Sequence, residues 1–314
     1  MKRGDRVDVQ SKLMQKLGIT INSLAIEFLQ LNEGDRIKTV AELAETYETA
    51  RGTIQSAIKF LKDQNALTLE SRGHLGTFIK EINYIRLLEL TGIKSLVGVM
   101  PLPYSKRYEG LATGICKCLN DSGVNTNLAF MRGSNHRLKA LEDGRYDFAV
   151  TSRLTADFYL EQNKDIQIIK TFGDFSYVNE HIMVVSKKFD GMFKKGTRVG
   201  IDTSSIDQFM LTKTYFEDLE VEYVNLNYSQ FITALKENEI DAAIWNLDDL
   251  QDRQDDIKFM PLNREEKNIK DTEAVIIANK RNSIVPALFS RVLDIEDVKE
   301  YQRLVMEKKI MPQY

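Results

Sequence analysis

The chain has 314 residues, of which 43% are hydrophobic and 28% are charged, and its formal net charge at pH 7 is −3. This length predicts two or three domains, and the composition is ordinary for a globular protein. No apolar run approaches the roughly 18 residues of a membrane span, and residues 1–6 lack the apolar stretch of a signal peptide. We therefore expect a cytoplasmic chain with no membrane partner.

The segment from 34 to 79 combines a short strand, two amphipathic helices and a hairpin. Thr39 and Glu42 have the spacing of a capping box, which predicts a helix start, and Thr49 can cap the next helix. Runs 67–69 and 76–79 are predicted strands around a turn. Apolar residues recur at helical spacing in both helices, namely Val40, Leu43, Ala44 and Tyr47, then Ile54, Ala57, Ile58 and Leu61. This order describes a winged helix-turn-helix, which places one helix in the DNA major groove and a wing beside it.

The outer face of the second helix carries small or hydrogen-bonding side chains, which suit an approach to base edges and phosphates. Residues 1–82 hold 12 lysines and arginines against 11 aspartates and glutamates, so their basic character is only local. A footprint this weak favours a homodimer on a two-fold DNA site. The alternative is an amphipathic helical domain that binds protein. The candidate DNA-contacting residues are Thr39, Arg51, Gly52, Thr53, Gln55, Ser56, Lys59, Arg72, His74 and Gly76.

Residues 23–79 resemble the GntR-type winged helix. The resemblance is carried by a glycine–aspartate strand at 34–35, a Glu-Leu-Ala helix at 42–44, an Arg-x-Thr helix start at 51–53 and a Gly-x-x-Gly-Thr-Phe wing at 73–78. It implies that Arg51 and Thr53 touch DNA, and that Arg72, His74 and Gly76 belong to the wing. Ala41 and Gln55 stand where the family often has basic residues, which implies a lower DNA affinity per subunit.

A helical stretch from 81 to 91 connects this head to the rest of the chain. Its residues Leu87, Leu88 and Leu90 suit either a dimer seam or packing within the chain. From Ser95 onward strands and helices alternate, and the first β-α-β-α-β run implies a parallel sheet covered by helices. The predicted strands are 96–100, 126–131, 147–150, 182–185, 198–201, 221–224, 242–245 and 272–278, with helices at 109–122, 135–143, from 206 and at 231–236, and more helices at the end.

The strand–turn–helix unit occurs twice, as 128–150 and as 221–244, and both copies end in similar phrases. Two such α/β halves resemble a type 2 periplasmic-binding-protein fold. The whole order, a GntR-like head on such a domain, resembles the YhfZ-type family of transcriptional regulators. The resemblance implies an α/β chain with a winged helix-turn-helix at 1–82, a connector at 83–94 and a two-lobed ligand-sensing domain at 95–314.

A ligand site is expected where the strands end, because open α/β sheets bind ligands outside the carboxyl ends of their strands. Ser204 and Ser205 precede a helix, whose free N–H groups and dipole attract anions. Arg132 and Arg153 can add bidentate bonds to a carboxylate or phosphate. We therefore expect a small, anionic effector. The candidate residues are Tyr104, Arg132, Gly133, Ser134, Thr151, Ser152, Arg153, Asp202, Ser204, Ser205 and Trp245.

Each of these candidates also has a purely structural interpretation. Serine and threonine before a helix often serve as caps, and Arg153 can form a surface ion pair. Trp245, the only tryptophan, suits either a stacking platform or the core.

Catalytic patterns are absent from the sequence. The three histidines lack metal-ligand spacing, and no nucleophile elbow, phosphate-binding glycine loop or dinucleotide fingerprint occurs. We expect no enzyme, no metal and no cofactor; the alternative is an enzyme on a binding-protein-like fold with a regulatory winged-helix head. The acidic runs 248–256 and 265–266 are interpreted as solvated surface, and Cys116 and Cys118 as buried free thiols.

These features together predict a ligand-responsive regulator. Its head would bind operator DNA, and its two lobes would close on a small molecule. Closure would change the separation or angle of two heads in a dimer, and so their fit to the two half-sites.

Overall fold

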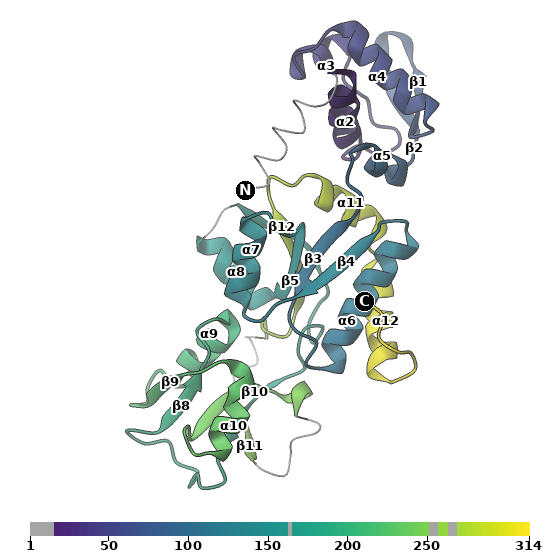
Figure 1. The fold of residues 1–314 in the computed structure, drawn as a ribbon. Coiled ribbons are helices and arrows are strands. Elements are labelled where there is room, and N and C mark those ends of the chain that lie inside the picture. Colours follow the sequence, from purple (N-terminus) through teal and green to yellow (C-terminus); the bar gives the residue numbers. More distant parts are fainter. Residues whose placement is uncertain (1–15, 163–164, 251–256, 263–268) are drawn as a thin grey trace.

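The computed structural model describes residues 16–162, 165–250, 257–262 and 269–314. These residues form a head at one end, a central lobe I and a lobe II at the opposite end (Figure 1). The expected fold class is confirmed: a helix-turn-helix head precedes a domain with two five-stranded sheets. Among the helices of the described residues, none is long and apolar enough to cross a membrane.

The head is a small helical core closed by an antiparallel hairpin. Thr39 Oγ1 accepts a hydrogen bond from Glu42 N–H at 3.2 Å, and Glu42 Oε2 accepts one from Thr39 N–H at 2.7 Å, so the capping box is confirmed. The expected cap by Thr49 is wrong, because the next helix begins one residue later, on the extended Ala50. The head elements are α2 (Lys16–Phe28), α3 (Val40–Thr46), α4 (Arg51–Asp63), β1 (Leu67–Ser71), the 3-10 turn η1 (Gly73–Leu75) and β2 (Thr77–Ile82).

Lobe I is built on a sheet with the strand order β4-β3-β5-β12-β6. Strand β3 is parallel to β4 and β5, whereas β12 is antiparallel to β5 and β6. The sheet is therefore mixed, not wholly parallel, because β12 returns from lobe II in the opposite direction. The elements are β3 (Leu96–Met100), α6 (Lys106–Asp121), β4 (Thr126–Phe130), α7 (Ser134–Glu142), β5 (Phe148–Ser152), α8 (Arg153–Gln162), β6 (Ile166–Thr171), β12 (Ala274–Asn279), α11 (Ile284–Val292) and α12 (Ile295–Met306).

Each face of the lobe I sheet has its own core, because side chains alternate along a strand. Met100 and Phe148 pack on the side of α6 and α12, whereas Val99 and Ala149 pack on the side of α7 and α8. Cys116 and Cys118 in α6 are buried free cysteines, as expected, and burial raises the pKa of each thiol to about 11.

Lobe II contains a second mixed sheet, with the order β11-β7-β10-β8-β9. Trp245 in β10 is 1% exposed and stacks on Tyr228 with ring centroids 3.9 Å apart, so its ring belongs to the core. The elements are β7 (His181–Val185), β8 (Arg198–Ile201), α9 (Ile206–Tyr215), β9 (Glu222–Asn225), η2 (Tyr228–Gln230), α10 (Phe231–Lys236), β10 (Ala242–Asn246), η3 (Leu247–Asp249) and β11 (Lys258–Pro261). Helix α8 and strands β6 and β11 were not predicted.

Helix α5 (Tyr84–Leu90) joins the head to lobe I. The helix is shorter than expected, because residues 81 and 82 still belong to β2. Leu87 lies in the head core and Leu88 in the lobe I core, and Leu90 packs against the head. These leucines therefore pack within the chain.

Polar contacts fasten the same junction. Arg291 in α11 donates from Nη2 to Leu31 O at 3.0 Å, and its guanidinium lies 4.4 Å from the ring centre of Tyr84. The Tyr84 hydroxyl also donates to Leu31 O, at 3.0 Å. Asn22 Nδ2 donates to Thr91 O at 2.6 Å. The head is thus held on lobe I through both α5 and α11.

Candidate functional site

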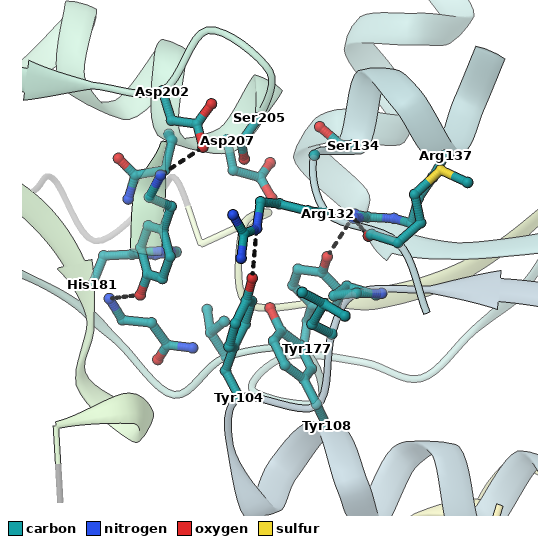
Figure 2. Close-up of a pocket in the computed structure, with 18 residues that line it drawn as sticks. Tyr104, Tyr108, Arg132, Ser134, Arg137, Tyr177, His181, Asp202, Ser205 and Asp207 are labelled. Atoms are coloured by element: carbon teal, nitrogen blue, oxygen red, sulfur yellow. Dashed lines mark hydrogen bonds between the residues drawn. The ribbon is translucent and has the colours of Figure 1, made fainter. Parts of the chain in front are cut away.

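A cavity of about 80 Å³ lies between lobes I and II, where the strand ends of the two sheets meet (Figure 2). Lobe I supplies the loops after β3 and β4 and the first turn of α7. Lobe II supplies the segment from Asp202 to Gln208, with Tyr228 and Asn246. This volume is several times what one water needs, so the cavity has room for a small molecule.

Arg137 is a buried cation that lines this cavity. It is 4% exposed, and its guanidinium donates from Nη1 to Met131 O at 3.0 Å and from Nη2 to the Tyr177 hydroxyl at 3.3 Å. Within the described part of the chain, its Nε has no hydrogen-bond partner and no carboxylate forms an ion pair with it. A buried charge without a counter-ion is unfavourable. The described residues supply Arg137 with no such counter-ion.

Asp207 faces the cavity from lobe II and links the lobes. Its Oδ1 accepts hydrogen bonds from Ser152 Oγ at 2.6 Å and from Thr155 Oγ1 at 2.9 Å, both in lobe I. Burial raises the pKa of the Asp207 carboxyl, because an ionised carboxylate is poorly solvated there. Nearby His181 opposes this shift and Asp271 adds to it.

The N-termini of α7 and α9 also meet across the lobes. Ser134 Oγ accepts a hydrogen bond from Ile206 N–H at 2.8 Å, and Asn135 N–H donates to Ser204 O at 3.1 Å. Gly133 has φ +74°, and a Cβ there would lie 2.8 Å from Ser204 Oγ, so this close approach requires glycine. One N–H group expected to attract an anion at α9 is thus already bonded by lobe I.

His181 lines the cavity and contacts Asp271 behind it, and these two residues lie on the two segments that cross between the lobes. His181 Nδ1 and Asp271 Oδ2 are 2.6 Å apart, and both side chains are buried. Such a carboxylate orients the imidazole and leaves Nε2 as the other polar atom of the ring. The hydrogen bond therefore ties one crossing segment to the other.

Two tyrosine contacts complete the lining. Tyr108 and Tyr177 pack edge to face with ring centroids 5.0 Å apart, and burial raises the pKa of both phenols. Arg132 Nε donates to the Tyr104 hydroxyl at 3.3 Å, and in Figure 2 its guanidinium points between Tyr104 and Asp202. Arg132 is therefore a second cation at the cavity, better exposed to water than Arg137.

The structure brings together six of the eleven ligand candidates and leaves five outside the lining. Those that line the cavity are Tyr104, Arg132, Gly133, Ser134, Asp202 and Ser205; those that do not are Thr151, Ser152, Arg153, Ser204 and Trp245. Arg153 donates to Asp157 Oδ1 at 2.7 Å, in a surface ion pair. Ser204 Oγ donates to Asp202 Oδ1 at 2.6 Å, while Ser152 acts on the lobe contact through Asp207.

The cavity lining also contains residues that the sequence did not single out as ligand candidates, among them the polar or charged Arg137, His181, Asp207 and Gln208. Arg137 and Asp207 each lie within the first turn of a helix that follows a strand end, one turn or less beyond the residues that were chosen. The first turn of a helix that follows a strand end is therefore a position from which ligand candidates can be predicted. The sequence alone does not reveal the contact of His181, because its partner Asp271 lies 90 residues away.

The acidic run near 248 is only partly a solvated surface. Asp248 accepts a hydrogen bond from Arg107 Nε of lobe I at 2.8 Å and another from Asn179 N–H at 2.9 Å. Residues 251–256 and 265–266 lie outside the described residues. No group of three or more His, Cys, Asp or Glu side chains within the described part of the chain is arranged to hold a metal ion.

All the DNA candidates except Thr39 lie on helix α4 or on the hairpin of the head. Six candidates lie on α4, and all of them are exposed except the half-buried Thr53: Arg51, Gly52, Thr53, Gln55, Ser56 and Lys59. Thr39 is the exposed cap of α3. The hairpin tip contains Arg72, His74 and Gly76. Arg72 pairs with Glu70 at 2.7 Å and lies over the ring of Phe78. Arg36 is a further exposed cation beside the hairpin, and it is not among the candidates from the sequence. Its backbone forms an isolated β-bridge with Phe78, and its side chain lies against Gly76.

Residues 83–314 match the family model of the YhfZ C-terminal domain. The chain belongs to the YhfZ family. It is 33% identical over 302 residues to the YhfZ protein of Escherichia coli (strain K12), covering 96% of this chain and 98% of that relative. Residues 32–79 match a helix-turn-helix domain model.

Solved structures agree with this assignment. The crystal structure of YhfZ from Shigella flexneri covers 73% of this chain and 97% of its own, with a TM-score of 0.62 and 33% identity. The periplasmic aliphatic sulphonate binding protein SsuA from Escherichia coli covers 69% of this chain and 75% of its own, with a TM-score of 0.51 and 14% identity. The second likeness concerns the fold alone and confirms the binding-protein-like architecture. A helix-turn-helix head in a YhfZ family chain points to a transcriptional regulator.

Proposed function

We propose that this YhfZ family member binds operator DNA through a GntR-like winged helix and senses a small anionic metabolite between its lobes. The observation that carries the sensing half is Arg137, a cation 4% exposed, without a carboxylate partner among the described residues, on the wall of the interlobe cavity. An anion would pair with it through charge-assisted bonds. Because operator DNA is the target, we place the protein in the cytoplasm.

We further propose that the cavity binds its ligand without transforming it. The pair closest to acid–base machinery is His181 with Asp271. A nucleophile would have to lie within hydrogen-bond reach of that imidazole. Among the described residues, no serine, threonine or cysteine side chain donates a hydrogen bond to His181. The pair is better explained as a brace between the crossing segments.

Ligand closure would act through lobe II. The head and lobe I are joined by shared apolar packing and by Arg291, so they are expected to move together. Lobe II contacts lobe I through Asp207, Ser134 and the Arg107–Asp248 pair. A ligand that favours these contacts shifts the chain toward the closed arrangement. In a homodimer, that shift would change the spacing of the two heads.

The test begins with DNA selected by the full chain from a randomised duplex library. Binding of the enriched duplex is then measured by fluorescence anisotropy with and without each member of a panel of small organic acids. A regulator of this kind enriches a defined sequence, and at least one acid changes the dissociation constant. By linkage, DNA must change the affinity for that acid by the same factor. Failure to enrich any sequence would contradict the operator-binding half of the proposal.

We expect the protein to be a homodimer on its DNA. One head presents a small and nearly neutral surface, which is too weak a footprint for tight specific binding alone. Two heads related by a two-fold axis would contact two half-sites about one helical turn, or a multiple of it, apart. Analytical ultracentrifugation checks the assembly at micromolar concentration, and nuclease footprinting checks the DNA. A monomer that protects one short site would contradict this expectation.

Replacing Arg291 by alanine is expected to loosen the head from lobe I. The change removes hydrogen bonds from a charged donor to Leu31 O and Asn32 Oδ1 and the contact with Tyr84. Hydrogen bonds of this kind contribute about 1.5–3 kcal/mol. Calorimetry should then separate a head transition from that of the lobes, and the response of DNA affinity to ligand should weaken.

The matched control for Arg291 is Arg281→Ala in the same lobe. Arg281 is largely exposed and pairs only with the exposed Asp165. Exposed pairs contribute little to stability. A single unchanged transition in both variants would show that Arg291 does not hold the head.

A further inference from the structure

Gln208 in α9 lines the interlobe cavity and carries one polar atom without a hydrogen-bond partner in the described part of the chain. The side chain is 4% exposed, and its Nε2 donates to Ile244 O at 2.7 Å. This bond fixes the orientation of the amide, because the oxygen could not face another carbonyl oxygen. Gln208 Oε1 is buried, and no group of the described residues donates a hydrogen bond to it. Buried polar atoms are rarely left without a partner, so the atom points to a missing donor.

Arg137 Nε of lobe I lacks an acceptor, whereas Gln208 Oε1 of lobe II lacks a donor, among the described residues. Arg137 Nε is a buried donor to which the residues that the structure describes offer no acceptor, and Arg132 adds a second guanidinium on the same side. Lobe I therefore offers donors and positive charge. Lobe II offers acceptors, because Asp207 lies next to Gln208 and also lines the cavity. Ser152 and Thr155 both donate to Asp207 Oδ1, which leaves Oδ2 without a donor among the described residues.

We propose that the effector is dipolar: it carries an oxyanion that pairs with Arg137 of lobe I and a hydrogen-bond donor, an ammonium or a hydroxyl, that meets Asp207 and Gln208 of lobe II. The inference rests on the proposed sensing function and names the ligand class of that same site. The cavity volume of about 80 Å³ requires the two groups to lie only a few bonds apart. Small amino acids and hydroxy acids have this chemistry.

The arrangement makes both ends of the ligand necessary for the switch. A simple carboxylate pairs with Arg137 and contacts lobe I alone, so it should bind the open and closed arrangements with equal affinity. A dipolar ligand bridges the lobes and satisfies Gln208 as well. Since a ligand shifts an equilibrium only by its differential affinity for the two states, only the bridging ligand should change DNA affinity.

Matched probes test this directly in the full chain. Acetate and propionate carry the oxyanion alone, glycolate and lactate add a hydroxyl, and glycine and alanine add an ammonium at the same carbon. Binding is measured by isothermal titration calorimetry and by thermal shift. We expect at least one dipolar probe to bind about tenfold or more tightly than its matched simple acid, the effect of one well-placed hydrogen bond to a charged group.

Two variants locate the second end of the ligand. In Asp207→Asn, the amide oxygen can still accept from Ser152 and Thr155, but an NH₂ donor replaces the second acceptor. Gln208→Met removes the acceptor Oε1 at similar length. Both should reduce the preference for dipolar over simple acids by about tenfold, and Asp207→Asn should keep the contact between the lobes. Asp157→Asn, in an outer ion pair with Arg153 and Lys270, is the control that should leave the preference unchanged.

The outcomes separate the two proposals. Simple acids that bind as tightly as dipolar ones, and switch DNA affinity equally, would overturn the dipolar assignment and leave the proposed sensor intact. A dipolar preference that survives both variants would also overturn it, because the donor would then be recognised elsewhere. If no acid of either kind binds, the proposed sensing of an anion fails together with the inference.

Discussion

The Arg137→Gln variant is expected to lose most of the stabilisation that an acidic effector gives the protein. At a ligand concentration of a hundred times Kd, the effector raises the free energy of unfolding of the wild type by about 2.7 kcal/mol. Hydrogen bonds to charged groups contribute about 1.5–3 kcal/mol, so the variant should bind about 10- to 150-fold more weakly. A hundredfold loss leaves only about 0.4 kcal/mol of stabilisation at the same concentration.

The ligand-free variant should fold, which makes the result interpretable. Wild-type Arg137 holds a charge 4% exposed with no carboxylate partner in the described part of the chain, and a neutral side chain removes that unfavourable burial. Glutamine can keep a hydrogen bond to Met131 O or Tyr177. The measurement is a thermal-shift titration of both proteins with the same acid. Arg145→Gln, which removes an exposed cation paired with Asp143 near the end of α7, is the control. Equal stabilisation of wild type and Arg137→Gln would exclude Arg137 as the anion site.

Sequence reasoning succeeded where the signal was local. The capping box of Thr39 and Glu42 depends on two residues that are three positions apart. The apolar stripes that bury Leu43 in α3 and Ile54 and Leu61 in α4 depend on residues three or four positions apart. Topology brings the strand ends of an open α/β sheet to one edge, and six candidates from three strand ends do line one cavity. The direction of β12 was not predictable in this way, because it is set by the return of the chain from lobe II.

The site residues that sequence reasoning missed depend on distant partners. Asp207 acquires its role from Ser152 and Thr155, more than 50 residues away, and His181 from Asp271. Arg137 stands out because it is buried and no carboxylate of the described residues pairs with it. Neither its burial nor its lack of a partner can be seen in the sequence. Arg153 has the charge and the strand-end position of a ligand residue, yet it lies at the start of α8 and its guanidinium donates to Asp157.

The largest expected effect in the head is that of Arg51→Ala. Arg51 is exposed at the first position of α4, the helix predicted to enter the major groove. If its guanidinium reads a base edge, alanine should weaken binding to the selected operator by about 1–3 kcal/mol, or about 5- to 150-fold, and relax the preference at that base pair. Binding to unrelated duplexes should change much less.

The Arg72→Ala variant distinguishes reading of bases from contact with phosphates. Arg72 stands on the wing, where it pairs with the exposed Glu70 at 2.7 Å and lies over Phe78, so it must exchange that carboxylate for a phosphate on DNA. Its loss should weaken all duplexes alike and reduce the slope of log K against log salt by about one. Arg281→Ala, in lobe I, serves as the control for a lost surface charge. Fluorescence anisotropy over a salt titration gives both quantities. If neither Arg51→Ala nor Arg72→Ala changes the affinity or the salt slope, α4 and the wing do not form the DNA interface. A cation that contacts a base or a phosphate would have to change at least one of these two quantities.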